Sequence, residues 1–221
     1  GSGGEAGSIR TLLLTFVGGL FLLAALGIGV VTTGTTDLTA MLHSPAWDGQ
    51  DVRLAIVAVL IALAAFSKAA QIPFHFWLPS AMAAPTPVSA YLHAAAMVKA
   101  GVYLVLRLAP GLADVEPWRP PAATLAVTTM LLGGIQALRQ HDLKLVLAHG
   151  TVSQLGFMVL LAGAGTRDAA LAALGLVVAH AMFKACLFLV VGVIDRKAGT
   201  RDLRELSGLG RRAPVLATAG I

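Results

Sequence analysis

The feature that most restricts this chain is a series of long apolar runs joined by short polar connectors. A helix needs about 20 predominantly apolar residues to cross the hydrocarbon core of a bilayer, and six runs have about that length. They lie at 11–31, 53–78, 86–108, 122–138, 143–163 and 169–194, and a seventh run opens at Ala213. The pattern predicts an all-α, polytopic membrane protein with about six complete transmembrane helices and part of a seventh.

The composition supports a membrane environment and argues against nucleic-acid binding. Hydrophobic residues make up 57% of the chain and charged residues 12%, against about 25% charged residues in a soluble domain. The net charge is +5, but the Lys and Arg residues lie mostly between apolar runs. Nucleic-acid binders instead gather them with aromatic residues on one exposed face. We therefore expect a lipid bilayer, and no nucleic acid, as a partner.

The sequence also lacks the motifs of common catalytic and cofactor sites. It contains no Walker-type glycine loop and no nucleophile elbow. The single cysteine, Cys186, lies inside an apolar run, so the chain has neither a disulfide framework nor a cysteine metal cluster. We interpret Cys186 as a small buried hydrophobic residue. No enzymatic activity, cofactor or bound metal is expected.

The two ends of the chain carry separate signals. The Gly/Ser-rich residues 1–7 predict a flexible stretch over 1–10, ahead of a transmembrane core over 11–221. The first apolar run is too long for the apolar region of a signal peptide, and further runs follow it. We therefore do not interpret it as a cleaved targeting peptide. The run that opens at Ala213 stops at Ile221, short of a full span. We therefore expect a fragment that ends within a helix.

The Lys and Arg residues of the connectors predict an orientation in the membrane. Short cytoplasmic connectors carry an excess of these residues. With the N-terminus inside, the connectors place nine of them on the cytoplasmic side and four outside. The nine are Arg10, Arg139, Lys144, Arg196, Lys197, Arg201, Arg204, Arg211 and Arg212, and the four are Arg53, Arg107, Arg119 and Arg167. The N-terminus and the 195–212 connector are thus predicted to be cytoplasmic.

Three lysines, Lys68, Lys99 and Lys184, lie within the apolar runs. A lysine at the centre of a transmembrane helix costs about 2.5–3.5 kcal/mol on insertion scales, so such residues usually face a bundle interior or a wet cavity and mark a functional site. His93 and His180 lie in the same runs. Histidine titrates near neutral pH and buried lysine changes its proton affinity readily, so a row of these groups can pass protons in turn.

Spacing indicates which of these residues can share a helix face. His180 and Lys184 are four residues apart and therefore lie on one face of a helix. His93 and Lys99 are six residues apart, which turns them about 120° from each other on a regular helix. Each of the second pair is therefore expected to face a different neighbour, which suits a relay between helices.

Structural roles remain open for several of these side chains. Lys68, near a helix end, could extend its ammonium group to the membrane interface, and the same holds with less force for Lys99. His149, in the fifth run, and His180 could serve only in hydrogen bonds between helices. We interpret Trp77, near the expected interface, as an anchor of the aromatic belt.

Four prolines, Pro73, Pro79, Pro85 and Pro87, follow Lys68 at the end of the second run and the start of the third. A proline removes a backbone donor and clashes with the preceding turn, so the helix that carries Lys68 is expected to break or kink near that charge. A broken helix at membrane depth needs protein or water around its free backbone groups, and transporters build ion sites at such breaks. A kink that only improves packing is the alternative.

Three stretches of the sequence resemble the antiporter-like membrane subunits of respiratory complex I and of Mrp antiporters. They are KAAQIPFHFWLPSAMAAPTPVSAYLHAAAMVKAGVYLVLRLAP, DLKLVLAHGTVSQLGFMVLLAG and AHAMFKACLF. Within this superfamily, the motifs AAPTPVSAYLH and MVKAG and the tail GVIDRKAGTRDLRELSGL are most similar to the large A-type subunits of Mrp-type monovalent cation/proton antiporters. The resemblance covers residues 10 to 221.

The resemblance implies a fold with two inverted five-helix repeats, each with a discontinuous helix. This chain would supply the end of the first repeat and the start of the second. Carried over by position, Lys68 matches the lysine of the broken helix, and the remaining matches lie along a central hydrophilic axis or in the DLK turn. They are His93, Lys99, His180 and Lys184 on the axis, and Lys144 in the turn. The resemblance implies that all of these residues, together with Lys68, take part in ion or proton translocation.

Two departures from the family pattern concern the expected relay. Many relatives carry a second histidine four residues before the one matched by His180, but Leu176 stands there. We therefore expect water to bridge that step. The glutamate that pairs with the broken-helix lysine is expected upstream of this fragment, and Glu5 is no substitute for it.

Taken together, the sequence predicts a proton-conducting subunit of a cation/proton antiporter in the cell membrane. The expected ions are Na⁺ and H⁺, and the expected partners are other membrane subunits of a multi-subunit complex. One rival hypothesis is a proton-pumping subunit of an NADH:quinone oxidoreductase, against which Lys99 and the GTRDL tail argue. Another is a purely structural membrane subunit, which would give no reason for lysines buried at several depths.

Overall fold

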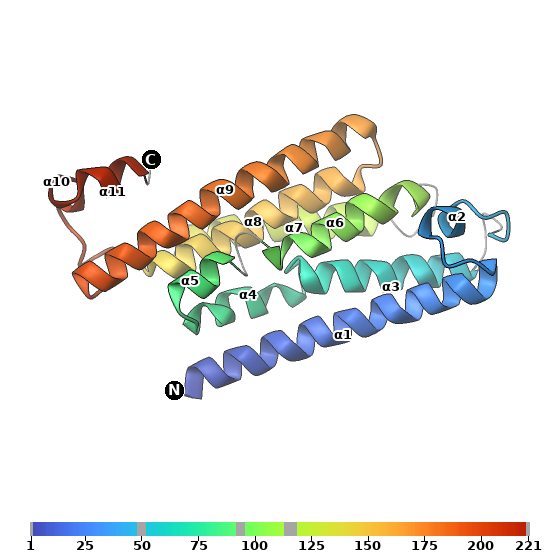
Figure 1. Ribbon diagram of the computed structural model, residues 1–221, viewed down its shortest axis with the longest axis horizontal. Helices are drawn as coiled ribbons and strands as arrows, with labels where there is room; N and C mark the ends of the chain where they lie inside the picture. Colours follow the sequence, from blue (N-terminus) through green and yellow to red (C-terminus); the bar gives the residue numbers. More distant parts are fainter. Residues whose placement is uncertain (1, 48–51, 92–95, 113–118, 220–221) are drawn as a thin grey trace.

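The computed structural model describes residues 2–47, 52–91, 96–112 and 119–219, and the chain folds as a helical bundle (Figure 1). Four helices in these ranges are long and apolar enough to cross a membrane. They are α1 (Ser2–Thr33), α7 (Arg119–Leu138), α8 (Leu143–Gly163) and α9 (Arg167–Ala198). Their axes run roughly parallel in Figure 1. The prediction of an all-α polytopic membrane protein is confirmed.

The remaining elements are shorter helices. Before the first interruption lie α2 (Leu38–Leu42) and α3 (Val52–Lys68). A hairpin-like region follows, with η1 (Phe74–Phe76), α4 (Trp77–Ser80), η2 (Ala81–Ala83) and α5 (Thr86–Ser89). The others are α6 (Lys99–Leu108), η4 (Ala109–Leu112), α10 (Leu209–Arg212) and α11 (Pro214–Ala219).

Helix α1 starts earlier than the sequence predicted. A flexible stretch was expected over 1–10, but α1 already begins at Ser2. The first turns of α1 pack against α4 and η2, and a Cβ atom on Gly7 would lie 2.6 Å from the carbonyl oxygen of Ser80. Glycine lets the two backbones meet this closely. This contact compensates for the low helix propensity of the Gly/Ser-rich sequence.

The helices pack in a continuous series across the bundle. α3 packs against α1 on one side and α6 on the other, α6 packs against α8, and α8 also packs against α7 and α9. At Gly101 a Cβ atom would lie 2.5 Å from the carbonyl oxygen of Ala65 and from the amide nitrogen of Ala69. This small residue lets α6 approach the end of α3, which is where the first interruption begins.

The outer faces of the long helices are apolar. Leu12 and Phe16 on α1 and Met182 on α9 are exposed in this chain. Cys186 is also exposed, so the prediction that it is buried is wrong. It lies two residues after Lys184, which turns it about 200° away on the helix. The buried face of α9 carries Lys184, so Cys186 falls on the opposite face.

Two predicted spans are interrupted. The second, 53–78, consists of α3, a non-helical break after Lys68, and then η1 and α4. The third, 86–108, starts with α5 and is π-helical at Ala90, Tyr91 and Ala96. Among the described residues it is interrupted by a turn at residues 97–98, after which α6 begins. Figure 1 shows α4 placed beyond the end of α3, and α5 beyond the start of α6.

The four prolines have different positions in this region. Pro73 lies in the break itself, directly after Ile72, and the peptide bond between them is cis. Pro79 lies within α4. Pro85 is the N-cap of α5, and Pro87 occupies its first turn, where proline is well tolerated because its missing N–H would have no helical partner. The predicted break is therefore confirmed at Pro73, while the last two prolines start a helix.

Candidate functional site

The break after Lys68 replaces regular helical bonding over a few residues. Ala70 has φ of 48°, in the left-handed region that residues other than glycine seldom adopt. The amide of Gln71 donates to the carbonyl of Phe66, five residues back, at 2.9 Å. The chain then turns through Ile72 and Pro73 into η1. The last helical residue before this turn is Lys68.

Side chains from elsewhere in the bundle satisfy backbone groups at the break. The amide of Ile72 donates to Thr129 Oγ1 of α7 at 3.0 Å, and Trp77 Nε1 donates to the carbonyl of Ser67 at 2.9 Å. Trp77 is fully buried, so its predicted role as an interfacial anchor is wrong. Its indole N–H instead bonds the end of α3. A bilayer supplies no water to these backbone groups, so hydrogen bonds from the protein satisfy them instead.

Lys68 is half-buried at the C-terminal end of α3. The C-terminal end of a helix carries a partial negative charge of about half a unit, which favours a cation there. α3 ends well before residue 78, the predicted end of its span, so Lys68 lies where the break begins.

A second group of titratable side chains gathers between α6, α8 and α9. Lys99, the first residue of α6, is 7% exposed, and its Nζ has no hydrogen-bond partner among the described residues. His180 of α9 is fully buried, and neither ring nitrogen has a partner in the described part of the chain. Its ring lies close enough to Lys99 and Lys184 for both charges to act on it.

Lys184 completes this group one turn after His180. It is 6% exposed, and its Nζ donates to the carbonyl of Leu147 in α8 at 3.3 Å. A Cβ atom on Gly150 would lie 3.1 Å from the same Nζ, so the missing side chain of Gly150 leaves room for the ammonium group. The expected shared face of His180 and Lys184 is thus confirmed by their burial on one side of α9.

The other predictions about single residues have mixed outcomes. His93 lies outside the described residues. The expected angle of 120° between His93 and Lys99 therefore stays a prediction. The burial of Lys99 excludes an interfacial ammonium group. His149 Nδ1 pairs with the carbonyl of Leu145 in its own helix, at 2.9 Å, instead of bridging helices.

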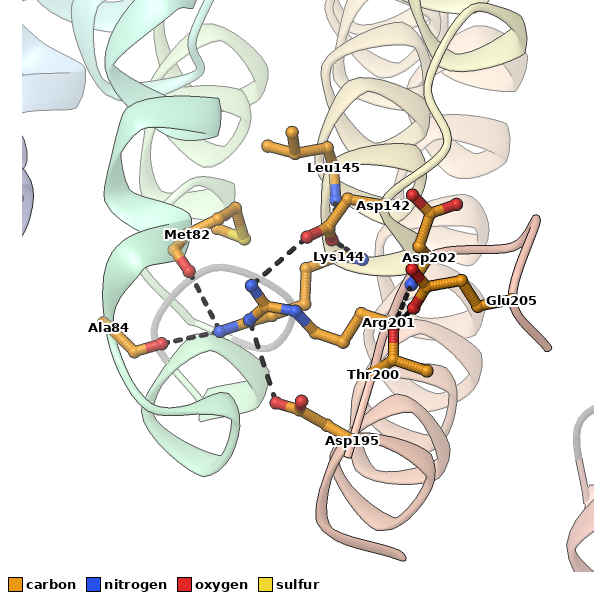
Figure 2. A network of polar contacts seen from close by, with 10 residues as sticks. All are labelled: Met82, Ala84, Asp142, Lys144, Leu145, Asp195, Thr200, Arg201, Asp202 and Glu205. Atoms are coloured by element: carbon orange, nitrogen blue, oxygen red, sulfur yellow. Dashed lines mark hydrogen bonds and ion pairs between the residues drawn. The ribbon is translucent and has the colours of Figure 1, made fainter. Parts of the chain in front are cut away.

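Lys144 belongs to a different set of contacts (Figure 2). It is the second residue of α8 and is 2% exposed. Its Nζ donates to the carbonyl oxygens of Ala84 at 2.6 Å and Met82 at 3.0 Å. Asp142, the N-cap of α8, accepts hydrogen bonds from the amides of Lys144 and Leu145 at 2.7 and 3.3 Å.

The connector after α9 joins this set of contacts through Arg201. Its guanidinium group lies 3.2 Å from the carboxylate of Asp142 and 3.8 Å from that of Asp195. The connector also pairs its backbone with the start of α8, where Asp142 and Asp202 form a β-bridge. Hydrogen bonds from Arg204 lower the pKa of the Asp202 carboxyl to about 2, so it stays ionised at physiological pH.

Sequence reasoning missed several residues at these sites. Thr129 carries no signal of its own, because its partner, the amide of Ile72, lies 57 residues away in the sequence. The buried Gln71 donates to the nearby carbonyl of Ala69, a contact that depends on the shape of the break. Asp142 carried a signal, since an Asp directly before an apolar run is a typical N-cap. Arg201 was counted only for the orientation.

Comparison with known proteins identifies relatives along nearly the whole chain. The family described as "NADH:quinone oxidoreductase/Mrp antiporter, TM" matches residues 4–220. A protein named as the probable A/B subunit of a K(+)/H(+) antiporter, from Rhizobium meliloti, is 46% identical over 212 residues. A protein named as the A subunit of a Na(+)/H(+) antiporter, from Alkalihalophilus pseudofirmus, is 41% identical over 229 residues.

Solved structures show the same similarity. A chain of the Mrp complex from Dietzia sp. DQ12-45-1b is 50% identical, with a TM-score of 0.93 over 99% of this chain. A chain of an archaeal membrane-bound sulfane sulfur reductase is 26% identical, with a TM-score of 0.86 over the full chain. The present chain covers 21% and 28% of the two sequence relatives, and 24% and 46% of the two structures.

The bonding at the break predicts the effect of Thr129→Val in the full-length protein. Valine keeps the shape of threonine but leaves the Ile72 amide without its acceptor, so we expect a loss of about 1–3 kcal/mol of stability. The adjacent variant Thr128→Val is the control, because the Thr128 hydroxyl donates to Thr124 of its own helix. The measurement is the thermal unfolding midpoint in detergent. Equal midpoints for the two variants would contradict the assigned role of Thr129.

Proposed function

Because this chain belongs to the NADH:quinone oxidoreductase/Mrp antiporter transmembrane family, we propose that it is part of the proton-conducting membrane subunit of a monovalent cation/proton antiporter. Its role is that of a secondary transporter and not of an enzyme. It works in the cell membrane with other membrane subunits of a multi-subunit complex. The relatives named as antiporter subunits, at 46% and 41% identity, favour this function over that of a quinone reductase subunit.

The observation that carries this proposal is the group formed by Lys99, His180 and Lys184. Three titratable side chains are buried together, and their polar atoms have few hydrogen-bond partners among the described residues. Buried polar groups are costly without hydrogen bonds, so a purely structural role gives no reason to keep them. Groups that exchange protons need partners that change during the cycle, which this arrangement allows.

Coupling between the groups provides a route for stepwise transfer. When titratable groups lie close together, protonation of one opposes protonation of the next, and they titrate as a unit. His180 lies within electrostatic reach of both lysines, so a proton that arrives at one lysine affects the other through the imidazole. His93, between Lys68 and Lys99 in the sequence, is proposed to link the break to this group.

The break at Lys68 is proposed as the switch of the transport cycle. A cation near the negative end of α3 responds to any charge that arrives or leaves nearby. Its partner is proposed to be a glutamate of the full-length protein outside residues 1–221. Na⁺ is proposed as the exchanged ion. The relatives are named for both K⁺ and Na⁺, so transport assays should compare the two cations.

Substitution of Lys99 in the full complex tests the relay. Lys99→Ala removes the titratable group, and Lys99→Arg keeps a charge that effectively never releases its proton. We expect both to lose antiport, measured as the Na⁺-driven or K⁺-driven pH change in everted vesicles and normalised to assembled complex. Lys197→Ala, at an exposed lysine of α9, is the control and should transport normally. Normal antiport by Lys99→Arg would rule out Lys99 as a proton carrier.

The proposed orientation places the 195–212 connector and the N-terminus in the cytoplasm, because the Lys and Arg residues gather there. A cysteine introduced at the exposed position Lys197 of the full-length protein should then react with an impermeant maleimide in everted vesicles and remain unlabelled in intact cells. This comparison uses a background in which Cys186 is replaced by Ser. Labelling of Lys197→Cys from outside intact cells would reverse the proposed topology.

A further inference from the structure

We propose that Lys144 is a positioning residue, whose ammonium group fixes the turn between the two interrupted spans against the start of α8. It keeps its charge and its place while protons move through other residues. This inference rests on the proposed function, because it assigns Lys144 a part in transport through the interrupted spans. It separates Lys144 from the lysines of the relay, with which the family resemblance had grouped it.

The turn that Lys144 binds connects both breaks. It comprises residues 82–85, from the second residue of η2 to the N-cap of α5, and Ala84 has an extended backbone there, with φ of −65° and ψ of 157°. Upstream, η2 and α4 lead back to the break after Lys68, and downstream α5 leads towards α6 and Lys99. A shift of this turn therefore moves elements attached to both interruptions.

The contacts of the ammonium group suit a fixed anchor. Nζ donates to two carbonyl oxygens of the same turn, those of Ala84 at 2.6 Å and Met82 at 3.0 Å, and the side chain is 2% exposed. An ammonium group has three donors, and two of them are used here by one short segment. Carbonyls of a buried irregular segment need such donors, because the packed protein keeps water away from them.

The backbone of Lys144 is also held in place. Asp142 accepts a hydrogen bond from the Lys144 amide at 2.7 Å and forms an ion pair with Arg201 at 3.2 Å (Figure 2). Arg201 reaches Asp195 near the end of α9 as well, at 3.8 Å. The anchor thus ties together the turn, the start of α8, the end of α9 and the connector.

The other buried lysines have different surroundings. Lys99 Nζ has no partner among the described residues, and Lys184 Nζ donates a long hydrogen bond, at 3.3 Å, to Leu147. A group that passes protons must exchange partners, whereas a group that fixes a turn must keep them. On this criterion Lys144 differs from the two lysines beside His180.

The test measures the turn and transport separately in the full-length protein within its complex. A reporter cysteine is introduced at the buried Ser89 of α5, which directly follows the turn, with Cys186 replaced by Ser. Its rate of reaction with a maleimide reports movement of the turn, and the cation-driven pH change in everted vesicles reports antiport. Both are normalised to assembled complex for Lys144→Met, Lys144→Arg and Lys184→Met.

We expect Lys144→Met to raise the labelling rate about tenfold, which corresponds to about 1.4 kcal/mol of lost closing free energy, and to reduce antiport. Lys144→Arg should restore both readouts, because arginine supplies fixed donors and does not release its proton. Lys184→Met, the matched buried lysine, should lose antiport while labelling stays unchanged. Because arginine is larger than lysine, a second variant leaves Lys144 itself intact. Arg201→Gln removes the ion pair with Asp142, and we expect it to make labelling faster as well.

Two results would overturn the positioning role. One is unchanged labelling in both Lys144→Met and Arg201→Gln. The other is loss of antiport in Lys144→Arg with normal labelling, which would make Lys144 a proton carrier. Failure of the proposed function gives a different result, namely normal antiport in Lys184→Met, and the labelling experiment still tests the turn in that case.

Discussion

A bilayer offers no water to a broken helix, and this constraint shapes the centre of the structure. Once α3 ends at Lys68, the free backbone groups of the break must find partners within the protein. Thr129 supplies an acceptor to Ile72, and Trp77 supplies a donor to Ser67. These two bonds come from different elements of the bundle, one from α7 and one from α4. The break is therefore stabilised by the surrounding bundle and not by its own sequence.

The same constraint explains why the buried lysines differ. At the turn between η2 and α5, Lys144 supplies the donors that two carbonyls need, and its ammonium group is held by them. Lys99 and Lys184 flank His180, where few described partners exist. The first arrangement resists movement, and the second leaves charged groups ready to change partners. One bundle can thus hold both a fixed frame and a titratable group.

How well the sequence predicted these features depends on how local their causes are. The apolar run at 143–163 became α8 with the same bounds, because both ends carry local signals and the length is set by the bilayer. The i, i+4 spacing placed His180 and Lys184 correctly, and Pro73 indicated the first break. The interruption before Lys99 has no proline within AAAMVKAGVYL and was missed. Trp77 and Thr129 were beyond prediction, because their partners lie ten and 57 residues away in the sequence.

Chemical replacement of Lys68 tests the central claim, that a lysine at a helix break gains and loses a proton during transport. Lys68→Cys in the full-length protein, treated with bromoethylamine, rebuilds a side chain of nearly the same length whose amine is a weaker base. The measurement is the pH dependence of cation-driven antiport in vesicles of the assembled complex. If Lys68 gains and loses a proton during transport, activity returns with its pH profile shifted towards lower pH. Restored activity with an unchanged profile would contradict it, because Lys68 would then act only as a constant charge.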